Sequence, residues 1–143
     1  MKFNMDESLG FILNRTAIST KMSFNKLIKS HGISPEQWSI IFRVVEKNGI
    51  NQKELADSTY KDQGNLTRMI DKLVEKGYLI RKLNETDRRA FKLLATDKSK
   101  LLVENVVPIS NLYNEQLTKD FTENEKVKLI ELLNKVYNNI QKD

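Results

Sequence analysis

Apolar side chains recur every three or four positions along most of the chain, and polar residues fill the positions between them. This period predicts amphipathic α-helices. The first such segment extends from Asp6 to Gly32, where a glycine suits a left-handed helix end. Ser34, followed by proline and then by Gln37, forms the pattern of a capping box and begins a second helix, which should end near Gly49. The apolar face of this second helix is predicted to comprise Trp38, Ile41, Phe42 and Val45.

Two shorter helices are predicted in the middle of the chain. Asn51 can cap the first and Asp62 the second, because short oxygen-bearing side chains accept hydrogen bonds from the free backbone N–H groups at a helix start. The second of these helices should end at Gly77, after a cation that suits a helix C-terminus. Its buried face is predicted to comprise Leu66, Met69, Ile70 and Leu73.

After Gly77 the pattern changes from a helical to a strand-like one. Residues 78–83 and 90–95 are rich in apolar residues and form two strand candidates, and residues 84–89 between them are polar. Two short strands joined by a polar tip predict a β-hairpin. Because an isolated hairpin is marginally stable in water, it should pack against the helices that precede it.

Helical periodicity returns for the last third of the chain. Thr96 can cap a long helix that contains Pro108, which removes one backbone donor and should kink the helix. Thr122 and Glu125 form a second capping box, and the final helix carries one apolar stripe. The predicted fold is therefore mainly α with a small β-hairpin wing, namely a winged helix-turn-helix with an added helical dimerisation region.

Composition narrows the classes of function. The 143 residues carry a net charge of +5, contain one histidine and no cysteine, and include no stretch that resembles a phosphate-binding loop or a glycine-flanked nucleophile. We therefore expect a protein that is not an enzyme and that has no cofactor and no metal site. The N-terminus does not resemble a signal peptide and no apolar run is long enough to span a membrane, so we expect a cytoplasmic protein without membrane association.

The second of the two short helices carries residues that can contact DNA. A two-helix unit followed by a basic hairpin can place its second helix in the major groove. Four polar side chains should point away from its apolar face: Gln63, Asn65, Thr67 and Arg68. Glutamine and asparagine can pair with adenine and arginine with guanine, and Gly64 allows a close approach of the backbone. The alternative is that these residues form only the solvated face of a surface helix.

The hairpin adds positive charge beside this helix. Residues 76–92 contain six cations and two acids. An arginine on a projecting loop suits the negative potential of a narrow minor groove, and Asp87 could hold an arginine in an extended pose through a charge-assisted hydrogen bond. The alternative is a solvated turn with an incidental ion pair. Together the helix and the hairpin favour double-stranded DNA as the partner.

The arrangement resembles the MarR family of bacterial regulators. The resemblance lies in residues 34–38, 52–56, 66–79 and 94–96, and in the wing tip at Asp87, Arg88 and Arg89. It implies that the D-x-R motif of the wing falls on Asp87 and Arg89, and that Arg89 enters the minor groove. At Gly64 and Asn65 the chain departs from the small hydroxyl residues usual in the family, so the resemblance does not give an operator sequence.

The same resemblance implies a homodimer held by the chain ends. We expect residues 1–33 and 96–143 to mediate dimerisation and residues 34–95 to form the DNA-binding domain. Residues 96–143 contain seven cations and eight acids and so lack the positive bias of the middle of the chain. A two-fold dimer should bind a near-palindromic operator, and repression by steric blocking is the usual role in the family.

Members of the family often bind a small aromatic ligand between the dimerisation and DNA-binding parts. The candidate ligand-binding residues are Trp38, Phe42, His31 and Tyr113. Packing in the core, or at a helix end for His31, is the simpler interpretation of each. The other function left open is a winged-helix module that binds protein instead of DNA, against which the basic tip at Arg88 and Arg89 argues.

Overall fold

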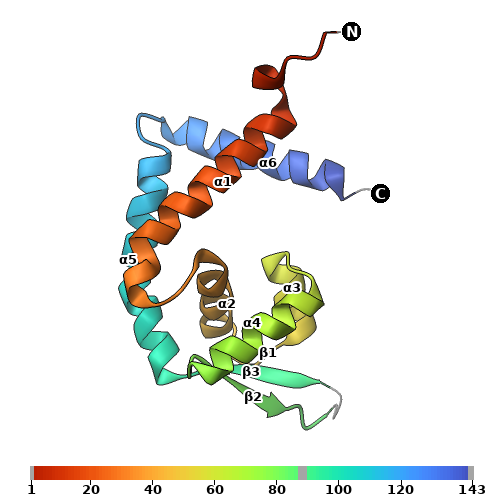
Figure 1. Ribbon diagram of the computed structural model, residues 1–143, viewed down its shortest axis with the longest axis vertical. Helices are drawn as coiled ribbons and strands as arrows, with labels where there is room; N and C mark the ends of the chain where they lie inside the picture. The colour runs from red at the N-terminus through yellow and green to blue at the C-terminus, as the bar shows by residue number, and fades with distance from the viewer. Residues whose placement is uncertain (1, 87–89, 142–143) are drawn as a thin grey trace. The chain divides into compact units, whose positions relative to one another are not determined.

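The computed structural model describes residues 2–86 and 90–141. The chain divides into two compact units, Met1–Ile109 and Ser110–Asp143. The helices of the first unit are α1 (Leu9–Ile28), α2 (Pro35–Glu46), α3 (Gln52–Thr59), α4 (Gln63–Glu75) and the first part of α5 (Asp97–Leu117), and its strands are β1 (Ile50–Asn51), β2 (Leu79–Leu83) and β3 (Phe91–Ala95). Within this unit, α2, α3 and α4 lie beside a small sheet whose hairpin projects beyond them (Figure 1).

Side-chain caps fix where the helices of the first unit begin. The Ser34 hydroxyl accepts a hydrogen bond from the Gln37 backbone at 3.2 Å, and the Gln37 amide oxygen accepts one from the Ser34 backbone at 3.0 Å. This confirms the capping box predicted for α2. Asn51 caps α3 and Asp62 caps α4, and each accepts from the backbone N–H three residues later, at 2.8 and 2.9 Å. These helix starts follow from local sequence, because each cap satisfies N–H groups that have no partner within the helix.

The first helix is shorter than predicted. A separate 3-10 turn, Met5–Glu7, precedes α1, because the Asn4 side chain accepts from the Asp6 backbone N–H and the chain is extended at Ser8. A second 3-10 turn, Lys29–His31, follows α1 and ends at Gly32, whose φ of 78° is the left-handed conformation expected there.

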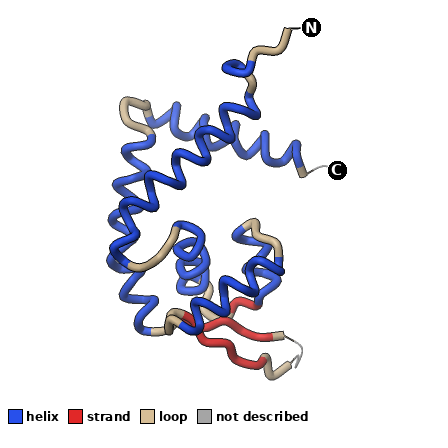
Figure 2. The backbone as a smooth tube through the Cα atoms, viewed as in Figure 1, coloured by secondary structure: helices blue, strands red, loops and turns tan. Residues whose placement is uncertain are grey.

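The strands form a three-stranded antiparallel sheet in the order β1-β3-β2 within the described residues (Figure 2). The hairpin is confirmed, and its register pairs Leu79 with Ala95 at the base and Leu83 with Phe91 near the tip. The two-residue strand β1 was not predicted. It is too short for a periodic signal, and Ile50 is paired with Leu93 of β3 while the next residue already caps α3.

The core of the first unit lies between the helices and one face of the sheet. On α4 the predicted apolar face is buried at Leu66, Ile70 and Leu73, whereas Met69 at its edge is half-buried. On α2 the most deeply buried residues are Ile40, Ile41 and Val44. The core side of α2 is therefore rotated from the predicted face, and Trp38, Phe42 and Val45 are half-buried at its margin.

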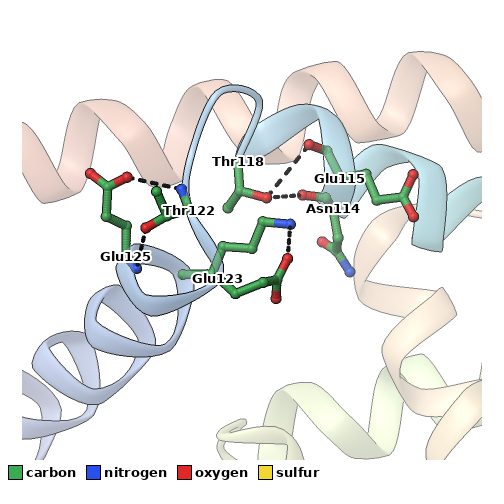
Figure 3. Close-up of polar contacts among 7 residues, drawn as sticks. Asn114, Glu115, Thr118, Thr122, Glu123 and Glu125 are labelled. Carbon is green, nitrogen blue, oxygen red and sulfur yellow. Dashed lines mark hydrogen bonds and ion pairs between the residues drawn. The ribbon is translucent and has the colours of Figure 1, made fainter.

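The second unit contains the end of α5 and the helix α6 (Glu123–Ile140). Thr122 accepts from the Glu125 backbone at 3.1 Å and the Glu125 carboxylate accepts from the Thr122 backbone at 2.9 Å, which confirms the predicted capping box (Figure 3). An ion pair of 3.0 Å between Glu123 and Lys126 adds to the same helix start.

Membrane-spanning helices and metal-binding clusters are both absent from the described residues. Among the described residues, no helix combines the length and apolarity that crossing a membrane requires. Within the same residues, no group of three or more histidine, aspartate or glutamate side chains is arranged to hold a metal ion.

Candidate nucleic-acid interface

The turn between α3 and α4 sets the position of the second short helix. Tyr60 ends α3 in the left-handed conformation, with a φ of 56°, and the Lys61 backbone N–H donates to the Ala56 carbonyl at 3.0 Å. Asp62 then begins α4 in an extended conformation. The chain thus turns within three residues, and α4 packs on the unit through Leu66 while its opposite face stays exposed.

The four candidate residues of α4 lie outside its buried face. Gln63, Asn65, Thr67 and Arg68 are all exposed. Among the described residues, a Cβ added at Gly64 would come within 4 Å only of the Asp62 carboxylate, at 3.4 Å. The backbone at the start of α4 is therefore open to close approach. The structure leaves all four candidates exposed, and their contact with a major groove stays a prediction.

Three residues at the start of α4 form a continuous polar chain. The Asn65 backbone N–H donates to Asp62 Oδ1 at 2.9 Å, and Asn65 Nδ2 donates to Asp62 Oδ2 at 2.7 Å. Arg68 Nη2 donates to Asn65 Oδ1 at 2.5 Å. The hydrogen bond from the Asn65 backbone is the largest cause that holds the pKa of Asp62 below its ordinary value. Desolvation is the next largest effect and raises the pKa, whereas the Asn65 amide and the Arg68 charge lower it further.

A side-chain hydrogen bond links α3 to α4. Gln52 Nε2 donates to Thr67 Oγ1 at 2.6 Å, and Thr67 Oγ1 donates to the Gln63 carbonyl at 2.8 Å. Thr67 is thus held by both helices of the helix-turn-helix. Sequence reasoning did not identify Gln52 as part of the site, because residues fifteen positions apart carry no local signal of contact.

A hollow of about 490 Å³ lies beside the start of α4. Three cations and two acids are among its lining residues, which are Glu36, Tyr60, Lys61, Asp62, Asn65, Arg68, Met69 and Lys72. Glu36 is also ion-paired with Lys21 of α1. Partial burial opposes ionisation of Glu36 and raises its pKa. The hydrogen bond from Lys21 outweighs this effect together with the Glu36 backbone N–H, the Lys21 charge and the Ser34 side chain, so the pKa of Glu36 lies below its ordinary value.

The wing carries positive charge on both of its strands. Arg81 of β2 forms an ion pair with Asp71 of α4, which ties the wing to that helix. Lys82 and Lys92 are paired directly across β2 and β3, and both are exposed. The predicted contacts Asp87, Arg88 and Arg89 lie outside the described residues.

The four predicted ligand-binding residues fall in both units. Trp38 and Phe42 lie together on α2, with ring centroids 5.6 Å apart and planes tilted by 45°. His31 is half-buried at the end of the second 3-10 turn. Tyr113 belongs to the second unit, where it is buried on α5. The structure therefore groups the first two of these residues, and a ligand role for any of the four stays a prediction.

Comparison with known sequences identifies a matching family and a relative that aligns with most of the chain. The family model described as the MarR family matches residues 33–91, which include α2, α3, α4 and β2. The HTH-type transcriptional regulator MhqR of Bacillus subtilis is 27% identical over 128 residues, which cover 90% of this chain and 88% of that protein.

Solved structures share the architecture described above. A MarR transcriptional regulator from Methanosarcina mazei Go1 is 28% identical with a TM-score of 0.80, and the match covers 92% of this chain and 94% of that chain. A mutant MarR from E. coli, complexed with operator DNA, is 27% identical with a TM-score of 0.86, and covers 95% of this chain and 98% of that one. Both likenesses extend through the helices at the chain ends.

Proposed function

The chain is a member of the MarR family of winged helix-turn-helix transcriptional regulators, and we propose that it acts in the cytoplasm as a homodimeric repressor. In this proposal α4 enters the major groove of double-stranded DNA and the wing contacts the adjacent minor groove. The observation that carries the proposal is the outer face of α4, where four exposed polar side chains lie on a helix whose opposite face is buried.

The proposed contacts are of two kinds. Gln63, Asn65, Thr67 and Arg68 supply side chains at the start of α4, and the wing supplies Asp87, Arg88 and Arg89, of which Arg89 enters the minor groove by family resemblance. The E. coli relative complexed with operator DNA supports this use of the fold. Positive charge on the wing strands also favours approach to phosphates.

The homodimer is supported by the exposed apolar surface of α6. Within the described part of a single chain, no side chain of this helix is buried. Five apolar residues at helical spacing nevertheless form one stripe, with exposed fractions from 39% to 65%: Val127, Ile130, Leu133, Tyr137 and Ile140. Because an isolated helix of this length is marginal in water, a second chain covering the stripe would stabilise it.

The proposal also divides the chain by function. Residues 1–33 and 96–143 mediate dimerisation, and residues 34–95 bind DNA. A two-fold dimer presents two copies of α4 and so binds a near-palindromic operator with half-sites about one helical turn apart. Repression then follows because the bound dimer blocks access to the promoter.

Release of the dimer by a small aromatic ligand is the regulatory part of the proposal. Support comes from the aromatic pair Trp38 and Phe42, which is half-buried on α2 and can stack on a planar ligand. His31 and Tyr113 complete the set of candidate ligand contacts. A ligand that binds the DNA-free form more tightly would lower operator affinity.

The proposed function is tested by a fluorescence-anisotropy titration with a duplex from the intergenic region upstream of the chain's own gene. An unrelated duplex is the control, and both are titrated at two salt concentrations. We expect tighter binding to the upstream duplex, at two chains per site, and a log–log salt slope of about −0.9 for each phosphate contacted. Absence of binding to both duplexes would favour a winged-helix module that binds protein instead.

A further inference from the structure

Resting on the proposal that α4 binds DNA, we propose that Asp62 is a positioning residue that orients Arg68 toward a base pair by way of Asn65. Arg68 then recognises the base, and Asn65 serves as the link between the carboxylate and the guanidinium group. The sequence alone gave Asn65 as a candidate DNA contact of a residue type that can pair with adenine, and it gave Asp62 only a capping role.

The orientation of the Asn65 amide is fixed by the chemistry of its neighbours. An ionised carboxylate only accepts hydrogen bonds, so the Asn65 NH₂ group must face Asp62, and it does so at 2.7 Å. Asn65 Oδ1 is thereby turned to the other side, where Arg68 Nη2 donates to it at 2.5 Å. The carboxylate thus determines, through one amide, where the guanidinium group is held.

This arrangement changes which residue is suited to read a base. Bidentate recognition of adenine needs both the oxygen and the NH₂ group of an asparagine. In Asn65 each of these groups is already engaged once, the NH₂ group by Asp62 and the oxygen by Arg68, so pairing with adenine would have to share them. A guanidinium group carries five N–H donors in a planar fork, and among the described residues one hydrogen bond engages that of Arg68. The fork can therefore still form the bidentate pair with guanine.

The second carboxylate oxygen of Asp62 is the distinctive feature. Serine or asparagine would cap the helix about as well as aspartate, and neither would place a negative charge near DNA phosphates. Only Asp62 Oδ1 is used for the cap, whereas Oδ2 holds the Asn65 side chain. If capping were the whole role of Asp62, the substitutions Asp62→Asn and Asp62→Ser would leave DNA recognition unchanged, so these two variants separate the cap from the link.

The test measures base preference at each position of the upstream duplex, by competition with duplexes that carry single base-pair substitutions. The variants are Asp62→Asn, Asp62→Ser, Asn65→Ala and Arg68→Ala. The matched control is Asp57→Asn, which removes the same charge from an exposed position of α3. All variants are used as full-length chains, and circular dichroism checks that each one folds.

We expect Arg68→Ala to abolish the preference at one base pair, and Asn65→Ala and both Asp62 variants to weaken it at that same base pair by about tenfold. Affinity of the Asp62 variants for an unrelated duplex should not fall, because they have lost a negative charge. The control should keep the wild-type profile. A separate loss of A·T preference in Asn65→Ala, or wild-type profiles in the Asp62 variants, would overturn the proposal. So would an equal loss of affinity for every duplex.

A measurement without DNA keeps this inference separate from the proposed function. The side-chain N–H signals of Arg68 in an NMR spectrum of the free protein should shift and broaden in Asp62→Asn, because a guanidinium group without a fixed acceptor exchanges its protons with water faster. If the wild-type chain bound no duplex, the proposed function would fail while this signal still tested the link. Unchanged Arg68 signals in Asp62→Asn would refute it.

Discussion

Truncation of Ile130 to alanine tests the exposed stripe of α6 as a dimer contact. Ile130 is 63% exposed in a single chain, so a partner that covered it would remove most of its side chain from water. The substitution removes three carbon groups, at about 0.8 kcal/mol for each when fully buried. Scaled by the exposed fraction, this is about 1.5 kcal/mol per chain.

A two-fold dimer contains the substituted residue twice. The expected loss is therefore about 3 kcal/mol, which raises the dimer dissociation constant by about a hundredfold if the partner covers the whole exposed part. Alanine has a higher helix propensity than isoleucine, so the change does not weaken α6 itself. The effect should thus appear in association and not in helix content.

Sedimentation equilibrium over a range of protein concentrations measures this dissociation constant. The matched control is Lys135→Ala, an exposed charged position on the same helix, which should leave dimerisation unchanged. A dissociation constant for Ile130→Ala within about twofold of wild type would refute the assignment of this stripe to the dimer interface. Circular dichroism of both variants checks that α6 is retained.

Three further predictions separate the fold from DNA contacts. Urea unfolding should show that Leu66→Ala, at a fully buried position of α4, lowers the free energy of unfolding by about 2–5 kcal/mol, whereas Thr67→Ala, at an exposed position, lowers it by about 1 kcal/mol. Equal losses in the two variants would contradict the described burial. Lys82→Thr and Lys92→Thr should each reduce the salt slope of DNA binding by about 0.9, and the melting temperature should not fall, because each variant removes one of two like charges that face each other across the strands. Unchanged slopes would exclude phosphate contacts at these two lysines. Arg89→Ala should weaken operator binding in an anisotropy titration and leave the dimer intact, and an unaltered affinity would rule out its minor-groove role.

Local rules account for the parts of the fold that could be predicted from the sequence. A cap at Asn51 or Asp62 requires only a short polar side chain and a backbone N–H three residues away, so both helix starts were predictable. The hairpin was predictable for a similar reason, since two apolar runs flank a polar tip. The rotation of α2 was not, because two adjacent apolar faces of one helix compete and tertiary packing decides between them.

The candidate site was predictable only in part. The outer face of α4 followed from helical periodicity, and the link from Asp62 through Asn65 to Arg68 could have been found from their spacing of three residues. The contact between Gln52 and Thr67 joins two helices across a turn, and no pattern within either helix indicates it. Similarly, β1 is defined by its pairing with β3, which lies about forty residues later and leaves no pattern in the two residues of β1.

Asn51 takes part in both the sheet and the start of α3, so the base of the wing is fixed independently of the sequence at its tip. Its backbone position pairs with Lys92 of β3, while its side chain accepts from the Glu54 backbone at 2.8 Å and begins α3. The base of the wing is thus attached at the residue where the helix-turn-helix starts. Further out, the Asn84 backbone donates to the Ala90 carbonyl at 3.0 Å and closes the hairpin below its tip. The tip sequence could therefore be replaced by that of a relative while α4 kept its placement.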